Sequence, residues 1–162
     1  MKVLVTAGSR HGATSGIAEA VGRTLGDRGL DVTIARLEDV AEIDRYDVFV
    51  IGSAVYTGHW LKPAIELANR VAVEAEGRPV WMFSSGPLGD PPKPEGEPPQ
   101  VAELASAVGA REHRVFAGRL DKALLSRMER AVVKMVRAPE GDDRDFAEIS
   151  RWADGIADEL LG

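Results

Sequence analysis

The stretch "TAGSRHGATSGIAEAVG", residues 6–22, decides the fold of this chain. It leaves the short β-branched run Lys2–Ala7, which is typical of a strand and too brief for a helix. It then crosses a turn of small and hydroxylated residues and continues with Ile17, Val21 and Leu25 at helical spacing. The stretch therefore predicts a strand, a turn and a helix in direct succession.

The turn carries Ser9, Gly12 and Thr14, with Arg10 and His11 among them. A helix N-terminus has unpaired N–H groups and a partial positive charge, so it attracts anions. Gly12 lets the backbone approach a ligand closely, the two hydroxyls can donate hydrogen bonds, and Arg10 and His11 could add charge. The spacing matches neither G-x-G-x-x-G nor G-x-x-x-x-G-K-[ST]. Two interpretations remain: the hydroxyls cap the helix, or the loop binds a phosphate group.

Strand-like apolar runs alternate with helical patterns along the rest of the chain. The predicted strands are Asp31–Leu37, Tyr46–Gly52, Pro79–Phe83 and Arg111–Gly118, and the predicted helices are Lys62–Ala75, Lys122–Val136 and Phe146–Leu161. This alternation predicts one doubly wound α/β domain over residues 1–162, a five-stranded parallel sheet of order 2-1-3-4-5 with helices on both faces. Ligands of such sheets bind beyond the carboxyl ends of the strands, where the loops Gly8–Ala13, Ser53–Trp60 and Ser84–Asp90 meet.

Composition excludes several classes of protein. The 162 residues include 44% hydrophobic and 28% charged residues, as in an ordinary globular domain. Cysteine is absent, which excludes disulfides and thiolate metal sites, and we expect no metal. The net charge of −6 disfavours nucleic acid as a partner. No apolar run approaches the roughly 18 residues of a membrane span, so we expect a cytoplasmic protein.

The second and third loops have the chemistry of a site for a flat ring. Tyr56 and Trp60 offer aromatic faces for stacking, although Trp60 could instead pack inward as a core anchor. Ser84, Ser85, Gly86 and Gly89 expose backbone groups that can hydrogen-bond the polar edge of a heterocycle, although a plain turn would look the same. With a phosphate loop beside them, these loops predict FMN, with the deazaflavin F420 as the alternative.

The first loop resembles the phosphate-loop signature of the flavodoxin family. The signature is a Ser or Thr, two variable residues, Gly, one variable residue, Thr, and Ala four positions on, and it is matched by Ser9, Gly12, Thr14 and Ala18. Thr6 and Ala7 depart from the bulky residues that usually precede it. The segments "SRHGAT", "GSAVYTGHW" and "VFAGRL" more narrowly resemble the quinone-dependent protoporphyrinogen oxidases of flavodoxin fold.

The resemblance to these oxidases implies a flavodoxin-like fold and a set of cofactor-binding residues. Ser9, Arg10, Gly12, Ala13 and Thr14, with His11 beside them, would hold the FMN phosphate; Ser53, Ala54, Val55, Tyr56, Thr57, Gly58 and Trp60 would flank the ring; and Ser84, Ser85, Gly86, Pro87, Leu88 and Gly89 would line its edge. His59, within the ring loop, is the candidate catalytic residue, because histidine is the side chain best suited to guide a proton at physiological pH. The loop after the fourth strand has more Gly and Pro, and fewer cations, than that group of oxidases.

The segment Arg119–Arg137 is basic within an acidic chain. It holds six cations and two acids, and its apolar residues form a stripe at helical spacing. Such a helix could lie on the inner face of an anionic membrane or dock an acidic partner, or it could be an ordinary surface helix. The segment after the fifth strand also lacks the concentration of Tyr and Arg expected near a porphyrin or a quinone.

Two functions from different classes follow. The first is an FMN-dependent oxidoreductase that resembles quinone-dependent protoporphyrinogen oxidase, with a quinone or a porphyrin as partner. The second is a flavodoxin-type electron carrier that serves redox-protein partners, which the net negative charge favours. A flavin-free scaffold is disfavoured by the three ligand-like loops. Whether the chain is an enzyme, and its oligomeric state, stay open at this level.

Overall fold

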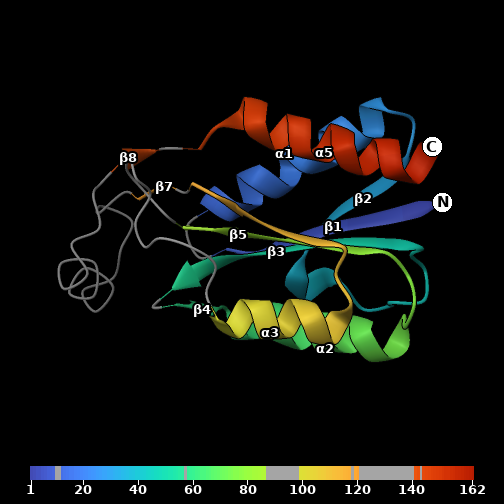
Figure 1. Ribbon diagram of the computed structural model, residues 1–162, viewed down its shortest axis with the longest axis horizontal. Helices are drawn as coiled ribbons and strands as arrows, with labels where there is room; N and C mark the ends of the chain where they lie inside the picture. Colours follow the sequence, from blue (N-terminus) through green and yellow to red (C-terminus); the bar gives the residue numbers. More distant parts are fainter. Residues whose placement is uncertain (10–11, 57, 87–98, 118, 121–140, 143) are drawn as a thin grey trace.

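Five parallel strands form the centre of the computed structural model, which describes all residues except 10–11, 57, 87–98, 118, 121–140 and 143 (Figure 1). The strands are β1 (Lys2–Gly8), β2 (Asp31–Arg36), β3 (Val48–Tyr56), β5 (Val80–Ser85) and β6 (Glu112–Phe116). They lie in the order β2-β1-β3-β5-β6, and the short β4 (His59–Trp60) pairs antiparallel with β3. The predicted order 2-1-3-4-5 of the parallel strands is therefore confirmed.

Helices cover both faces of the sheet (Figure 1). Helices α1 (Ala13–Asp27) and α5 (Phe146–Leu161) lie side by side on one face, and α2 (Lys62–Glu74) and α3 (Pro99–Val108) cover the other. A 3-10 turn, η1 (Leu37–Asp39), follows β2. The bounds of α1, α2 and α5 agree with the sequence pattern to within a residue or two, which is the usual uncertainty of helix ends.

Helix α3 has no counterpart among the predicted elements. The proline-rich pattern over 86–99 predicts a loop, and no helix is expected before the strand at 111. The helix begins at Pro99, a position where proline's missing N–H costs no hydrogen bond. Val101 and Leu104 are buried on one face, so the helix is stabilised by packing against the sheet.

The strands separate two hydrophobic cores because neighbouring side chains point to opposite faces. On β1, Val3 and Val5 pack into the core beneath α1 and α5, whereas Leu4 packs into the core beneath α2 and α3. The central strands are buried on both faces, as expected of a parallel sheet covered by helices.

An aromatic cluster fills the core beneath α5. The rings of Phe83, Phe116 and Trp152 lie 5.4 to 6.1 Å apart between centroids, with tilted or edge-on geometry. Phe83 lies directly over Gly52 of β3: a Cβ at that position would be only 2.1 Å from the ring. The indole N–H of Trp152 donates to a carboxylate oxygen of Glu112 at 2.6 Å, which joins α5 to β6.

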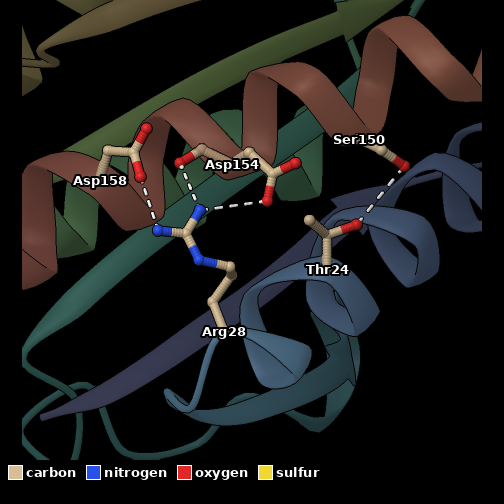
Figure 2. Close-up of polar contacts among 5 residues, drawn as sticks. All are labelled: Thr24, Arg28, Ser150, Asp154 and Asp158. Carbon is tan, nitrogen blue, oxygen red and sulfur yellow. Dashed lines mark hydrogen bonds and ion pairs between the residues drawn. The ribbon is translucent and has the colours of Figure 1, made fainter.

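Helices α1 and α5 are also joined by polar contacts (Figure 2). The guanidinium of Arg28, just after α1, contacts the carboxylates of Asp154 at 3.2 Å and Asp158 at 2.6 Å. The hydrogen bond with Asp158, followed by the one with Asp154, raises the pKa of Arg28 above its usual value. One turn earlier, the hydroxyl of Thr24 donates to that of Ser150 at 3.5 Å.

Beyond the carboxyl ends of the strands, β7 (Arg119–Leu120) pairs antiparallel with β8 (Gly141–Asp142). The predicted helix Lys122–Val136 lies between them in sequence, outside the described residues. Among the described helices, none is both long and apolar enough to span a bilayer.

Candidate functional site

Strand register brings the three predicted loops together at the carboxyl edge of the sheet. Gly8 of β1 pairs with Ser53 of β3, Ser53 pairs with Ser84 of β5, and Ser84 pairs with Val115 of β6. The loops that follow these residues therefore start side by side. They lie where the strand order turns back, because β2 is on one side of β1 and β3 is on the other. This is where an open α/β sheet binds its ligands.

The loop between β1 and α1 is closed by its own hydrogen bond. The Ser9 hydroxyl accepts from the backbone N–H of Gly12 at 3.0 Å, and Gly12 adopts φ of 85°, a left-handed conformation that favours glycine. Ser9 thus bonds to the residue that precedes α1 and does not cap the helix itself. Arg10 and His11 lie outside the described residues.

The N-terminus of α1 fits an anion. Its N-cap residue is Gly12, which has no side chain to cap the helix, and its first turn, Ala13–Gly16, holds no acidic residue. The first backbone N–H groups of a helix have no partner within it, and they carry the positive end of the helix dipole. Thr14, in that turn, is buried. This arrangement suits a phosphate group, held by backbone N–H groups and nearby hydroxyls.

The second loop differs from the prediction, because the strand does not end at Gly52. Strand β3 continues to Tyr56, and the chain then returns as β4, with Val55 opposite Trp60 and Tyr56 opposite His59. Gly58 takes φ of 81° between the two strands. Antiparallel pairing satisfies the backbone groups that β3 exposes beyond the edge of the sheet, so the segment forms a hairpin. Thr57 lies outside the described residues.

Trp60 does not offer its face to a ring, because the structure buries it. Only 3% of its surface is exposed, and it packs in the core beneath α2 and α3. Its indole N–H donates to the hydroxyl of Ser84 at 2.8 Å, and that hydroxyl lies 2.7 Å from Nε2 of His113. Its backbone N–H donates to Gln100 of α3 at 3.3 Å. The alternative, Trp60 as a core anchor, is what the structure shows.

Ser53 is also committed to the fold. It is fully buried, and its hydroxyl accepts from the backbone N–H of Leu61 at 3.0 Å and donates to the carbonyl of Ala54 at 2.9 Å. This hydroxyl therefore fixes the start of α2 against β3. Ala54, Val55 and Tyr56 are partly exposed along the hairpin, and His59 is exposed on β4.

The third loop approaches the hairpin closely. Ser84 and Ser85 are buried at the end of β5, and the N–H of Gly86 donates to the carbonyl of Phe116 at 3.4 Å. A Cβ at Gly86 would lie 3.3 Å from the carbonyl oxygen of Val55, so glycine allows the two loops to meet here. Pro87, Leu88 and Gly89 lie outside the described residues.

Sequence reasoning missed two residues at this edge. His113 of β6 contacts Ser84, and Arg144, just before α5, places its guanidinium Nη1 3.4 Å from the carbonyl oxygen of Ala13. Both contacts join segments far apart in the chain, and no local motif marks either residue. Within the described residues, no group of three or more His, Cys, Asp or Glu is placed to hold a metal ion.

The comparisons with known proteins agree with this fold. A family model described as "Flavodoxin domain" matches residues 4–147. A point mutant of a flavodoxin from Pseudomonas aeruginosa is 20% identical over 100% of both chains, with a TM-score of 0.63. A flavodoxin from the domain Archaea is 23% identical and covers 85% of this chain and 97% of its own, with a TM-score of 0.59. Megasphaera elsdenii flavodoxin is 19% identical over 85% of this chain and 100% of its own, with a TM-score of 0.58.

These likenesses to solved structures establish the fold. Flavodoxins bind FMN, and the comparisons give no support to the alternative cofactor F420. The predicted FMN cofactor is thereby confirmed at the level of the family, whereas the roles of the individual residues stay predictions.

Proposed function

The chain belongs to the flavodoxin domain family, and from this premise we propose that it is an FMN-binding redox protein that carries electrons between protein partners. The observation that carries the proposal is the acid-free N-terminus of α1, reached through the Ser9–Gly12 loop at the carboxyl edge of the sheet. The hairpin and the Gly86 loop meet beside it. Bound FMN would supply the electron chemistry through its ring.

Different residues of this chain would contact the phosphate and the ring of FMN. The backbone N–H groups of the first turn of α1, with the hydroxyls of Ser9 and Thr14, would hold the phosphate. The exposed side of the β3–β4 hairpin, with Tyr56, would flank the ring, and Gly86 would offer backbone groups to its edge. Trp60 and Ser53 would support the hairpin from below, without touching the ring.

The net charge supports the role of a carrier. At −6, the chain would attract basic redox partners and would lose affinity for them as ionic strength rises. A carrier of this kind would work in the cytoplasm.

The second candidate function is oxidation of a small substrate, resembling quinone-dependent protoporphyrinogen oxidase. It is favoured by the Gly58-His59-Trp60 sequence, because His59 is exposed on the hairpin and could guide a proton. The basic segment 119–137, which would meet a membrane or a quinone in this alternative, lies almost wholly outside the described residues.

Binding of FMN to the apoprotein tests the primary proposal. Titration by flavin fluorescence should give a dissociation constant for the wild type and a weaker one for Thr14→Ala and Gly12→Glu. We expect a loss of about tenfold or more, since a hydrogen bond to a charged group contributes about 1.5–3 kcal/mol. Thr33→Ala, at an exposed position on β2, is the matched control and should bind like the wild type. A wild-type protein that takes up no FMN would refute the proposal.

Electron transfer separates the two functions. The FMN-loaded protein should exchange electrons with a flavoprotein reductase in a salt-dependent manner, and it should not oxidise protoporphyrinogen in the presence of a quinone. Steady turnover of protoporphyrinogen that His59→Ala abolishes would instead establish the oxidase.

A further inference from the structure

Three polar side chains form a line across the core beneath α2 and α3. The indole N–H of Trp60 on β4 donates to the hydroxyl oxygen of Ser84 on β5 at 2.8 Å, and this oxygen lies 2.7 Å from Nε2 of His113 on β6. The rings of Trp60 and His113 meet edge-on, with 6.5 Å between their centroids. Trp60 and Ser84 are buried, and His113 is half-buried. The line therefore joins the return strand of the hairpin to two strands of the central sheet.

Strand register places these side chains on one face of the sheet. Met82 of β5 pairs with His113 of β6, and Ser84 lies two residues beyond Met82, so its side chain points to the same face. Met82 and Trp60 belong to the hydrophobic core on that face. Because hydrogen bonds are directional, a polar line inside this core permits fewer arrangements of the three strands than apolar contacts would. The line is therefore suited to fixing the position of β4.

The donors and acceptors of the line determine its direction. An indole N–H can only donate, so the Ser84 oxygen accepts from Trp60. The hydroxyl of Ser84 keeps one proton, and within the described residues Nε2 of His113 is the acceptor that it contacts. A ring nitrogen that accepts carries no proton, so neutral His113 holds its proton on Nδ1. His113 also takes part in a further interaction, alongside the contact of its Nε2 with Ser84.

We propose that His113 is a positioning residue for the ring of FMN. By accepting from Ser84, it fixes the orientation of the hydroxyl that receives the Trp60 N–H, and so it holds β4 against the sheet. This inference rests on the proposed function, in which the β3–β4 hairpin flanks the ring. His113 would act through Ser84 and Trp60 and would not touch the cofactor.

The hairpin links the position of Trp60 to the side that would face the ring. Trp60 pairs with Val55, and the next pair is Tyr56 with His59. If the indole loses its fixed partner, β4 gains freedom that FMN has to remove on binding, and a site that must be ordered binds its ligand less tightly. The phosphate would be held by the first turn of α1, so this cost concerns the ring. FMN and riboflavin, which has the same ring and no phosphate, should therefore be affected equally.

The affinities of these two flavins test the proposal. Dissociation constants of FMN and of riboflavin are measured for the wild type, His113→Leu and His113→Gln. Leucine removes the acceptor and keeps an apolar side chain, so both flavins should bind about fivefold more weakly, the equivalent of one ordinary hydrogen bond. Glutamine keeps an amide oxygen that can accept from Ser84, so its affinities should return to within about twofold of the wild type.

Arg114→Leu is the matched control. Arg114 is the next residue on β6 and is also half-buried, but its side chain points to the opposite face, where its guanidinium lies 3.8 Å from the carboxylate of Glu148. Both flavin affinities of this variant should stay within about twofold of the wild type. Ser84→Ala is a second test variant, which keeps the experiment informative if His113→Leu does not fold. It removes the shared hydroxyl and should weaken both flavins at least about fivefold.

A cofactor-free measurement tests the hydrogen bond itself. Nitrogen-15 NMR spectra of the wild-type apoprotein at about pH 8, where histidine side chains are mostly neutral, should show a proton on Nδ1 of His113 and none on Nε2. The His113 signals are identified by their absence from the spectrum of His113→Gln. The indole N–H signal of Trp60 should move in His113→Leu and stay near its wild-type position in His113→Gln. A role in stability alone would not produce this pattern.

The outcomes are distinguishable. If the wild type binds FMN and His113→Leu binds both flavins as tightly, this inference is wrong and the proposed function stands. A loss confined to FMN would also overturn it, because the effect would then concern the phosphate. A proton on Nε2 would overturn it as well, since His113 would then donate to Ser84. If the wild type binds neither flavin, the proposed function itself fails, and the spectra still show whether His113 accepts from Ser84.

Discussion

Gly52 shows how little room the core leaves at a single position. Its Cα faces the ring of Phe83, and an added Cβ would lie 2.1 to 2.4 Å from three ring atoms. We expect Gly52→Ala to push Phe83 out of its packing with Phe116 and Trp152. Overpacking of this kind typically costs about 1–3 kcal/mol, which denaturant unfolding would measure as a lower midpoint at an unchanged slope.

Gly155→Ala is the matched control for this substitution. Gly155 lies on the exposed side of α5, and no atom of the described residues lies within 4 Å of the Cβ position. Alanine should therefore stabilise the protein, by about 0.5–1 kcal/mol, because glycine inside a helix is unfavourable. Equal stability of Gly52→Ala and the wild type would show that Phe83 can move without cost.

Single residues of the site are only partly predictable from the sequence. Ser9, Gly12 and Thr14 can be placed because strand, turn and helix are local, and their spacing determines where they lie. The burial of Trp60 cannot be predicted from the sequence, because it depends on pairing with Val55 and on a hydrogen bond to Ser84. An aromatic residue in an apparent loop looks the same in sequence whether a distant strand covers it or not.

At the scale of elements, charge links the two helices on one face. Arg28 contacts Asp154 and Asp158 of α5, with 35% of its side chain exposed (Figure 2). We expect Arg28→Gln to lower the thermal midpoint by a few degrees in low salt. The difference from the wild type should shrink in high salt, because exposed ion pairs are screened.

Arg23→Gln removes the same charge from an exposed position of α1 and is the control for this prediction. It should shift the midpoint less than Arg28→Gln does in low salt. A loss at Arg28 that is independent of salt would mean that packing of its stem against α5, and not charge, joins the helices.

The elements themselves are mostly readable from periodicity, and the exceptions have physical causes. Helix α5 has the predicted bounds, because Ile149, Trp152 and Ile156 recur at helical spacing. Helix α3 escapes prediction because it follows a proline-rich stretch. The predicted end of β3 is wrong because Ser53 and Ala54 pair with the end of β5, and because Val55 and Tyr56 pair with β4, a partner only two residues long.

At the scale of the molecule, the candidate site and the chain ends lie at opposite edges of the sheet. Figure 1 shows both termini at the amino end of β1, whereas β4 and the first turn of α1 lie at the other end. The order of the parallel strands follows from the alternation of strands and helices, since right-handed crossovers leave few arrangements. The contact of Arg144 with α1 does not follow from this alternation, because it joins residues 131 positions apart.

This separation predicts where the chain tolerates insertions. A short Gly/Ser insertion after Gly77, in the turn between α2 and β5, should leave the FMN affinity within about twofold of the wild type. The same insertion after Gly58 should weaken FMN at least about tenfold, because it alters the hairpin that would flank the ring. Fluorescence titration of the two proteins measures both. Loss of affinity from the Gly77 insertion alone would place the site at the wrong edge.

The buried indole of Trp60 gives the protein an internal optical probe. Of the three tryptophans, Trp60 alone belongs to the hairpin, while Trp81 lies within β5 and Trp152 within α5. Its N–H donates to the hydroxyl of Ser84, near the carboxyl edge of β5, so the emission of Trp60 should change when the surroundings of the hairpin change. In a variant that carries both Trp81→Phe and Trp152→Phe, the fluorescence of Trp60 would report the state of the hairpin without any added label. Trp60, which is buried beneath the hairpin, is therefore the tryptophan whose fluorescence best reports on the hairpin.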